Sequence, residues 1–245
     1  MQLRYIYPLA LIIAFVMFIT EGDVIFRGKV KNVYVYTPQY KYISPHVTIS
    51  PYDEKFREAA DTLGWDWKFI AAIAFTESRF DSTAVSGVGA CGVMQVMPAT
   101  LRGFGVPDSL HMDTRSNIMA AAGLLGSLDH LYRRIGDFNE RSNFILASYN
   151  AGAGHIGDAM NLAEKHGRPR YVWHQNVDSF LVLKSLPEFY TDSVCRNGSF
   201  NDWKQTLSFV KKVKRSWKRF NILQERYNDS ISRLLANDTT IRIRR

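Results

Sequence analysis

Apolar residues recur every three or four positions through most of the chain after Pro51, which is the spacing of amphipathic helices. Glycine, proline and capping aspartate divide this pattern into segments: Gly64 and Gly136 end helices, Asp66 caps one and Pro98 opens another. The predicted helices span residues 53–63, 67–80, 98–103, 117–135, 141–149, 155–166, 178–186 and 202–235. No stretch has the alternation of a hairpin or the rhythm of a β–α–β unit, so the sequence predicts a mainly α protein.

The N-terminal pattern is different. Arg4 precedes an uncharged run from Tyr5 to Thr20, which Glu21 follows. At 1.5 Å per residue this run spans roughly 24 Å, less than the ~30 Å hydrocarbon core of a bilayer. Residues 1–22 are therefore predicted to be a long signal peptide or a short, uncleaved membrane anchor, and either one places the rest of the chain on the periplasmic side of the envelope. Residues 23–50 show no clear period and predict a tether.

Positive charge is concentrated at the C-terminal end. The formal net charge is +8, but residues 204–245 alone hold twelve Lys or Arg against three acidic residues. We therefore do not interpret the whole surface as a nucleic-acid platform. The predicted organisation is a helical domain over residues 51–222 followed by a basic tail over residues 223–245, of which residues 237–245 are expected to fray. The segment from Lys211 to Arg219 is expected to provide electrostatic attraction at the surface.

The chain has two cysteines, Cys91 and Cys195. Export would permit a disulfide, and with two cysteines only one pairing exists. We expect that bridge; the alternative is two separate buried thiols.

One carboxylate lies where the helical pattern calls for an apolar residue. Ile70, Ile73 and Ala74 form an apolar stripe whose next member is Glu77. A buried carboxylate must be neutral, paired or facing a cleft, and apolar neighbours raise its pKa. A carboxyl that stays protonated near neutral pH is the proton donor that cleavage of a glycosidic bond requires. The alternative is a helix-end glutamate paired with a base such as Arg79.

Other stretches are informative mainly for what they exclude or leave open. The loop from Gly87 to Gly92 matches G-x-G-x-x-G, but a helix precedes it and no β–α–β unit surrounds it, so a dinucleotide site is excluded.

Gln95 is a lone amide in an apolar run and is suited to binding sugar hydroxyls. Tyr149 and Asn150 fit either a helix end or a binding site. The six histidines are scattered without ligand spacing, so no metal site is predicted.

Four of these stretches together resemble the lytic transglycosylase family with a lysozyme-like SLT domain. The resemblance covers roughly residues 51–190 and is specific because several separate motifs agree in order and spacing. Val93 and Ser148 are mild departures from the family pattern. The motifs are "ESRF" (77–80), "SGVGACGVMQ" (86–95), "MPAT" (97–100) and "ASYNAG" (147–152).

The resemblance implies a lysozyme-like fold, a peptidoglycan substrate cut at its MurNAc–GlcNAc bond, and no cofactor. It implies that Glu77 is the catalytic acid/base, that Ser86 orients the substrate, that Gln95 contacts the saccharide, and that Tyr149 and Asn150 line the cleft. The implied partners are glycan strands, and the membrane if the N-terminal segment is uncleaved; nucleic acid is not among them.

The expected reaction is non-hydrolytic. Glu77 would first donate a proton to the leaving oxygen and then take one from the muramyl 6-hydroxyl, which closes a 1,6-anhydro ring. The nearest alternative is a goose-type lysozyme-like hydrolase, which splits the same bond with water. A lysozyme-like hydrolase of the retaining type would need a second carboxylate about 5 Å away. Asp81 is the local candidate, although we expect it to have a capping or surface role at the helix end. A catalytically inactive peptidoglycan-binding module is the remaining alternative.

Overall fold

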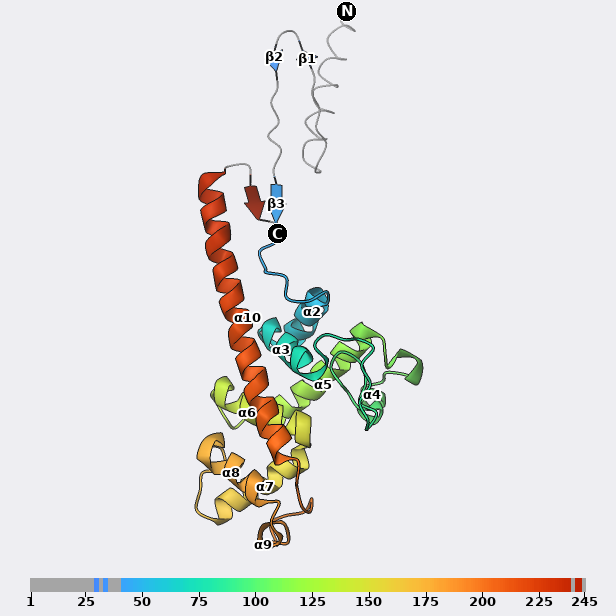
Figure 1. Ribbon diagram of the computed structural model, residues 1–245, viewed down its shortest axis with the longest axis vertical. Helices are drawn as coiled ribbons and strands as arrows, with labels where there is room; N and C mark the ends of the chain where they lie inside the picture. The colour runs from blue at the N-terminus through green and yellow to red at the C-terminus, as the bar shows by residue number, and fades with distance from the viewer. Residues whose placement is uncertain (1–28, 31–32, 35–40, 239–240, 244–245) are drawn as a thin grey trace, which may run out of the picture. The chain divides into compact units, whose positions relative to one another are not determined.

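The computed structural model describes residues 29–30, 33–34, 41–238 and 241–243, so the predicted signal or anchor at residues 1–22 lies outside it. Over the described residues the protein is mainly helical, as predicted (Figure 1). None of the helices among these residues has the length and apolar character needed to cross a membrane. The chain forms two compact units, a larger one of residues Val47–Tyr227 and a smaller one of residues Met1–His46 with Asn228–Arg245.

The larger unit is built from helices, short connections and the first part of the longest helix. In chain order the helices are α2 (Asp53–Leu63), α3 (Trp67–Ser78), α4 (Pro98–Gly103), the 3₁₀ turn η1 (Asp108–Leu110), α5 (Thr114–Leu131), α6 (Phe138–Ala151), α7 (Ala153–Lys165), the π turn η2 (Trp173–Val177), α8 (Asp178–Leu183), α9 (Pro187–Tyr190) and α10 (Trp203–Asn237). Residues of α10 after Tyr227 belong to the smaller unit.

Helix ends follow the capping residues of the sequence. Gly64 has φ 66°, and its amide donates to two carbonyls of the last turn of α2, as its position predicted. The Asp66 side chain accepts the amide of Lys68 at the start of α3. The structure corrects two starts: α5 and α6 begin three residues before the predicted positions, because Asp113 and Asp137 accept amide hydrogens of their first turns.

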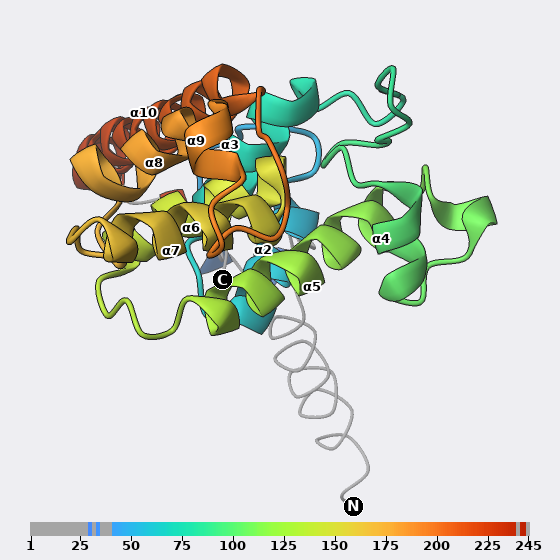
Figure 2. The same cartoon turned by 90° about the horizontal axis from the view of Figure 1, so that it is seen from below.

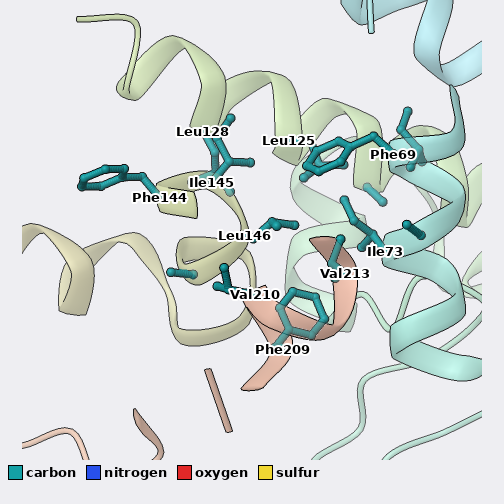
Figure 3. Packing of buried hydrophobic residues seen from close by; sticks show 14 of the residues in the cluster. Phe69, Ile73, Leu125, Leu128, Phe144, Ile145, Leu146, Phe209, Val210 and Val213 are labelled. Atoms are coloured by element: carbon teal, nitrogen blue, oxygen red, sulfur yellow. The ribbon is translucent and has the colours of Figure 1, made fainter. Parts of the chain in front are cut away.

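The core of the larger unit lies where α3, α5, α6 and α10 meet, and side chains from all four helices point toward one another there (Figure 3). Residues 69–74 of α3 and 144–148 of α6 are buried on all sides, whereas α10 turns only its apolar face inward, and this packing removes a large apolar area from water. The labelled core residues are Phe69, Ile73, Leu125, Leu128, Phe144, Ile145, Leu146, Phe209, Val210 and Val213.

The first part of α10 is integral to this core rather than a separate basic arm. It passes beside α3 (Figures 1 and 2), and aromatic rings of the two helices are in contact. The ring of Trp217 lies 5.0 Å from that of Phe69, and its indole N–H donates to Asp66 at 2.8 Å. Lys214 donates to the Asn139 carbonyl at 2.6 Å and to the Ser142 hydroxyl at 2.6 Å. The predicted long helix is confirmed. Its apolar face, which includes Phe209, Val210 and Val213, explains why it packs against the core.

Short strands in the smaller unit were not predicted. Strand β1 (Lys29–Val30) pairs with β2 (Val33–Tyr34) in an antiparallel ladder, and β3 (Lys41–Ile43) pairs in parallel with β4 (Ile241–Ile243). The expectation that residues 237–245 fray was therefore wrong for Ile241–Ile243. Strands of two or three residues are too short to show a period, and the partner of β4 lies about 200 residues away in sequence.

The predicted disulfide is corrected as well, because both cysteines are free thiols. Cys91 is buried, and its sulfur lies 3.5 Å from the Val96 carbonyl oxygen. Cys195 is half-buried, and its sulfur lies 3.4 Å from the Phe189 carbonyl oxygen. Each thiol thus has its own backbone acceptor, which is the alternative that the sequence left open.

Candidate functional site

Glu77 occupies the last turn of α3, at the end of the apolar stripe that the sequence indicated. Ile73 and Ala74, one turn earlier, are fully buried. The Glu77 carboxylate is half-buried and has no hydrogen-bond or ion-pair partner among the described residues. Burial raises its pKa from 4.5 to about 8, so the carboxyl is protonated at neutral pH. Arg79 is not its partner: the guanidinium is exposed and lies 5.5 Å from the Phe75 ring centroid.

The backbone leaves the helix directly after Glu77 and Ser78. Arg79 and Phe80 have φ of 56° and 69°, a left-handed conformation that costs non-glycine residues energy, so α3 ends two residues before the predicted Phe80. The Ser78 hydroxyl donates to the Val93 carbonyl at 2.8 Å. This contact ties the end of α3 to the loop of residues 82–97, which carries two of the predicted site residues.

Ser86 shapes that loop. Its amide donates to the Ala90 carbonyl at 2.8 Å, and its hydroxyl oxygen accepts the Ala90 amide at 2.9 Å. Val85 and Val96 flank the turn and each form an isolated β-bridge to Cys91. The Ser86 hydroxyl hydrogen stays available to a ligand, because these contacts use the oxygen only as an acceptor.

Gln95 adopts a left-handed backbone with φ 49°. Its side-chain nitrogen donates to the Ala84 carbonyl at 3.0 Å and to the Gly92 carbonyl at 2.9 Å. Both amide hydrogens are therefore used within the loop. The side-chain oxygen is the part of Gln95 that can accept a hydrogen bond from a ligand.

Asn117 of α5 holds the same loop from behind, and the sequence analysis did not identify it. This fully buried side chain donates to the Cys91 carbonyl at 2.9 Å and accepts the Met94 amide at 2.9 Å. Gly92, with φ 74°, permits the approach, because an added Cβ would lie 2.6 Å from the Asn117 amide. The sequence feature that could have identified Asn117 is its position as an amide side chain within an apolar helical pattern.

Tyr149 connects α6 to the loop and to Glu77. Its hydroxyl donates to the Met94 carbonyl at 2.8 Å, and its ring stacks with that of Phe209 at 6.4 Å. Burial raises the pKa of the Tyr149 hydroxyl, and the negative charge of Glu77 raises it further, so the two side chains interact. Tyr149 thus bonds to the loop at Met94, next to Gln95, and its hydroxyl is close enough to Glu77 for the charge of Glu77 to affect it.

Asn150 has a different environment from Tyr149. Its side-chain oxygen accepts the Thr206 hydroxyl of α10 at 2.8 Å. It lines a separate pocket of about 400 Å³ together with His155 and Phe200. Thr206 is buried and polar, and its link to Asn150 had no signal in the sequence.

Asp81 behaves as an exposed turn residue, in line with the surface role that was one of its two expected roles; the C-cap of α3 is Arg79. Its carboxylate accepts the Thr83 amide at 2.8 Å and the Thr83 hydroxyl at 2.7 Å, and these bonds lower its pKa. The side chain is exposed. Within the part of the chain that the structure describes, no cluster of His, Cys, Asp and Glu is placed to hold a metal ion.

Residues 54–171, which include Glu77, the loop and Tyr149, match the family model of the transglycosylase SLT domain. The chain carries an SLT domain. The SLT match ends before α8 and so does not include α10, although α10 packs against α3 and donates to Asn150.

Three curated relatives are each named membrane-bound lytic murein transglycosylase F. The protein of Desulfosudis oleivorans is 39% identical over 136 residues, that of Maricaulis maris 37% over 143, and that of Alcanivorax borkumensis 33% over 167. The matched segments cover 56%, 57% and 67% of this chain, but only 29%, 30% and 34% of those relatives. The chain thus spans about a third of their length, around the SLT domain.

Among solved structures, the 70 kDa soluble lytic transglycosylase of Escherichia coli matches 70% of this chain and 24% of its own, with 21% identity and a TM-score of 0.48. This likeness is too weak to specify the fold around the SLT domain.

Proposed function

We propose that this protein is a peptidoglycan lytic transglycosylase, which cleaves the MurNAc–GlcNAc glycosidic bond without water. The observation that carries the proposal is Glu77, a half-buried carboxyl with a pKa of about 8 and no partner among the described residues. The SLT domain match and the names of the curated relatives support the substrate class. A lysozyme-like arrangement of the helices and a location on the periplasmic side of the envelope belong to the same proposal.

The proposed chemistry uses one carboxyl twice. Protonated Glu77 donates its hydrogen to the glycosidic oxygen while the bond from that oxygen to muramyl C1 breaks, and positive charge develops on C1. The Glu77 carboxylate then removes the proton of the muramyl 6-hydroxyl, whose oxygen bonds to C1. The products are a free GlcNAc 4-hydroxyl and a 1,6-anhydromuramyl end, and Glu77 is protonated again. A pKa near neutrality suits both steps.

The neighbouring side chains take positioning roles in this proposal. The Gln95 side-chain oxygen accepts a hydrogen bond from a sugar hydroxyl, since its amide hydrogens are bound within the loop. The Ser86 hydroxyl donates to the substrate beside Glu77. Tyr149 holds the loop through Met94 and keeps the Glu77 carboxyl away from water. Asn150, held by Thr206, lines a more distant part of the glycan path.

A hydrolytic mechanism fits less well. A retaining hydrolase needs an ionised carboxylate near the acid to form the covalent intermediate. The local candidate Asp81 is exposed and uses one carboxylate oxygen to hold the turn at Thr83. One protonated carboxyl, with no suitable nucleophile close by in sequence, supports the proposal of an anhydro product.

Digestion of purified sacculi tests the proposal. The full chain is expected to release muropeptides that mass spectrometry finds one water lighter than the products of a hydrolase. Glu77→Gln keeps the shape of the side chain and removes the acid, so release should fall by a factor of at least about 100. Asp81→Asn is the matched control and should keep most of the activity.

The alternatives give different results in the same assay. Hydrated muropeptides whose release depends on Asp81 would show a retaining hydrolase. Binding to sacculi with no release, unchanged in Glu77→Gln, would show a binding module.

A further inference from the structure

A second concave site lies in the larger unit, between the end of α3 and one face of α10. This groove has a volume of about 480 Å³. Its lining includes Phe75 and Thr76 of α3, and no acidic residue contributes to it. The basic residues that line it, which we call the cationic groove residues, are Arg79, Lys212, Arg215 and Arg219.

None of the four cationic groove residues forms an ion pair with a residue that the structure describes. Lys212, Arg215 and Arg219 are exposed and form no ion pair with any described residue, and Arg79 only covers the Phe75 ring. Their spacing on α10, three and four residues apart, puts three of them on one face. Lys214 lies on the opposite side of the helix and is bound to Asn139 and Ser142.

Like charges held this close repel one another, so the groove is stabilised by a ligand that carries several negative charges. Guanidinium groups bind carboxylates through two parallel hydrogen bonds, which favours a polycarboxylate over a single point charge. The half-buried Phe75 ring provides an apolar wall for the aliphatic part of such a ligand. The groove therefore fits a flexible acidic peptide.

We propose that the cationic groove binds the peptide stems of peptidoglycan through their carboxylates. This inference rests on the proposed function, which makes peptidoglycan the substrate. Each stem presents several carboxylates on an extended chain, and this matches a concave site with four cations. Phe75 and Thr76 of α3 line the groove and Glu77 follows them directly, so the helix that carries the proposed catalytic acid also contributes to the groove. A flat anionic lipid surface would match a convex face with exposed apolar side chains better.

The test measures binding of a free stem and does not depend on cleavage. The probe is the tripeptide L-alanyl-γ-D-glutamyl-meso-diaminopimelate, labelled at its N-terminal amine, and fluorescence anisotropy follows its binding to the full chain in a non-ionic detergent. The variant Lys212→Gln/Arg215→Gln/Arg219→Gln removes three groove charges. The matched control, Lys204→Gln/Lys211→Gln/Lys218→Gln, removes three charges from exposed lysines of the same helix that do not line the groove.

We expect the groove variant to bind the tripeptide about tenfold more weakly than the wild-type chain, and the control variant to change by less than about twofold. Added salt should weaken wild-type binding, and the tripeptide with amidated carboxylates should not bind. Circular dichroism shows whether both variants keep their helices.

Three results would overturn the inference: no binding of the tripeptide by the wild-type chain, equal weakening in both variants, or unchanged binding of the amidated tripeptide. Mixed micelles that contain phosphatidylglycerol form the lipid arm, and groove-dependent binding to them without tripeptide binding would assign the groove to lipid instead. Release of muropeptides from sacculi, which carry their stems, is measured alongside. The proposed function fails if the wild-type chain releases no anhydro products from them, whereas this inference can fail while those products appear.

Discussion

Glu77 differs from the other buried charged groups of the larger unit. Lys184 and Asp158 are both buried and form an ion pair at 3.0 Å, and Lys214 has three acceptors around it. Proteins pair buried charges because an unpaired one is costly. Glu77 has no such compensation among the described residues, so its position disfavours the ionised form and keeps a proton in place. A cost of this kind is expected at a catalytic position.

The first prediction concerns stability. The pKa of Glu77 is about 8 in the folded state against 4.5 as the reference value, so between these two pH values the folded state binds more protons than the unfolded state. The free energy of unfolding therefore falls as the pH rises, by at most about 1.4 kcal/mol per pH unit from this group. In Glu77→Gln this loss is absent, so the variant should be more stable than the wild-type chain at pH 8. Urea denaturation across this pH window measures the difference.

Asp81→Asn provides the opposite control. The pKa of Asp81 is lowered by its bonds to Thr83, so its contribution is present above its unfolded pKa and is lost as the pH falls through the folded value. Stability of Asp81→Asn should therefore match that of the wild-type chain at acidic pH and not at neutral pH. Identical pH profiles for Glu77→Gln and the wild-type chain would contradict a raised Glu77 pKa.

The second prediction concerns the pH dependence of the rate. Because the first step of the proposed reaction needs protonated Glu77, kcat/KM should be level below pH 8 and fall about tenfold per pH unit above it. Lys214 also has a pKa of about 8, lowered by burial, and could imitate this limb. Lys214→Gln should keep the limb, since Lys214 contacts Asn139 and Ser142. Loss of the limb in that variant, or an added acidic limb from an ionised nucleophile, would contradict the single-carboxyl mechanism.

At the scale of elements, periodicity and caps were enough to predict most helices and the stripe that leads to Glu77. The first residues of α5 and α6 were predicted less well, because Asp113 and Asp137 were not recognised as N-terminal caps. The contacts that shape the loop of residues 82–97 were not predicted. Asn117 and Ser78 bind backbone atoms far away in sequence, and such partners leave no periodic signal.

The third prediction tests how Asn117 holds that loop. Gly89 and Gly92 both have positive φ, of 88° and 74°, so alanine is strained at either position. An alanine Cβ at position 89 meets nothing within 4 Å, whereas at position 92 it would lie 2.6 Å from the Asn117 amide. Gly89→Ala should therefore cost about 1 kcal/mol, from strain alone, and Gly92→Ala clearly more, about 2–4 kcal/mol, because the buried amide must also move. Chemical denaturation of both variants measures the costs, and equal values would contradict this role of Asn117.

At the scale of the molecule, the concentration of basic residues near the C-terminus was visible in the sequence, but the two packing roles of α10 were not predicted. The same helix turns one face into the core, through Phe209, Val210 and Val213, and lines the cationic groove with another. The cysteines show a similar limit: their number allowed one disulfide, but only the fold shows that each thiol lies beside a separate backbone carbonyl. Packing decides which distant segments of the chain lie side by side, and amino-acid composition carries no information about that packing.

The last prediction is that the larger unit is sufficient for activity. Residues Val47–Tyr227 contain Glu77, the loop, Tyr149 and every residue of the cationic groove, and they form one compact unit. A fragment of residues 47–227 should unfold cooperatively with a Tm within about 4 °C of the full chain, equivalent to about 1 kcal/mol or less, and should release the same anhydro products from soluble glycan strands. A fragment of residues 47–206 is the control, because it removes the buried Phe209, Val213 and Phe220 and should not fold. Circular dichroism and mass spectrometry give the two readouts. If the longer fragment were unfolded or inactive, residues of the smaller unit would have to take part in the fold or the chemistry of the SLT domain.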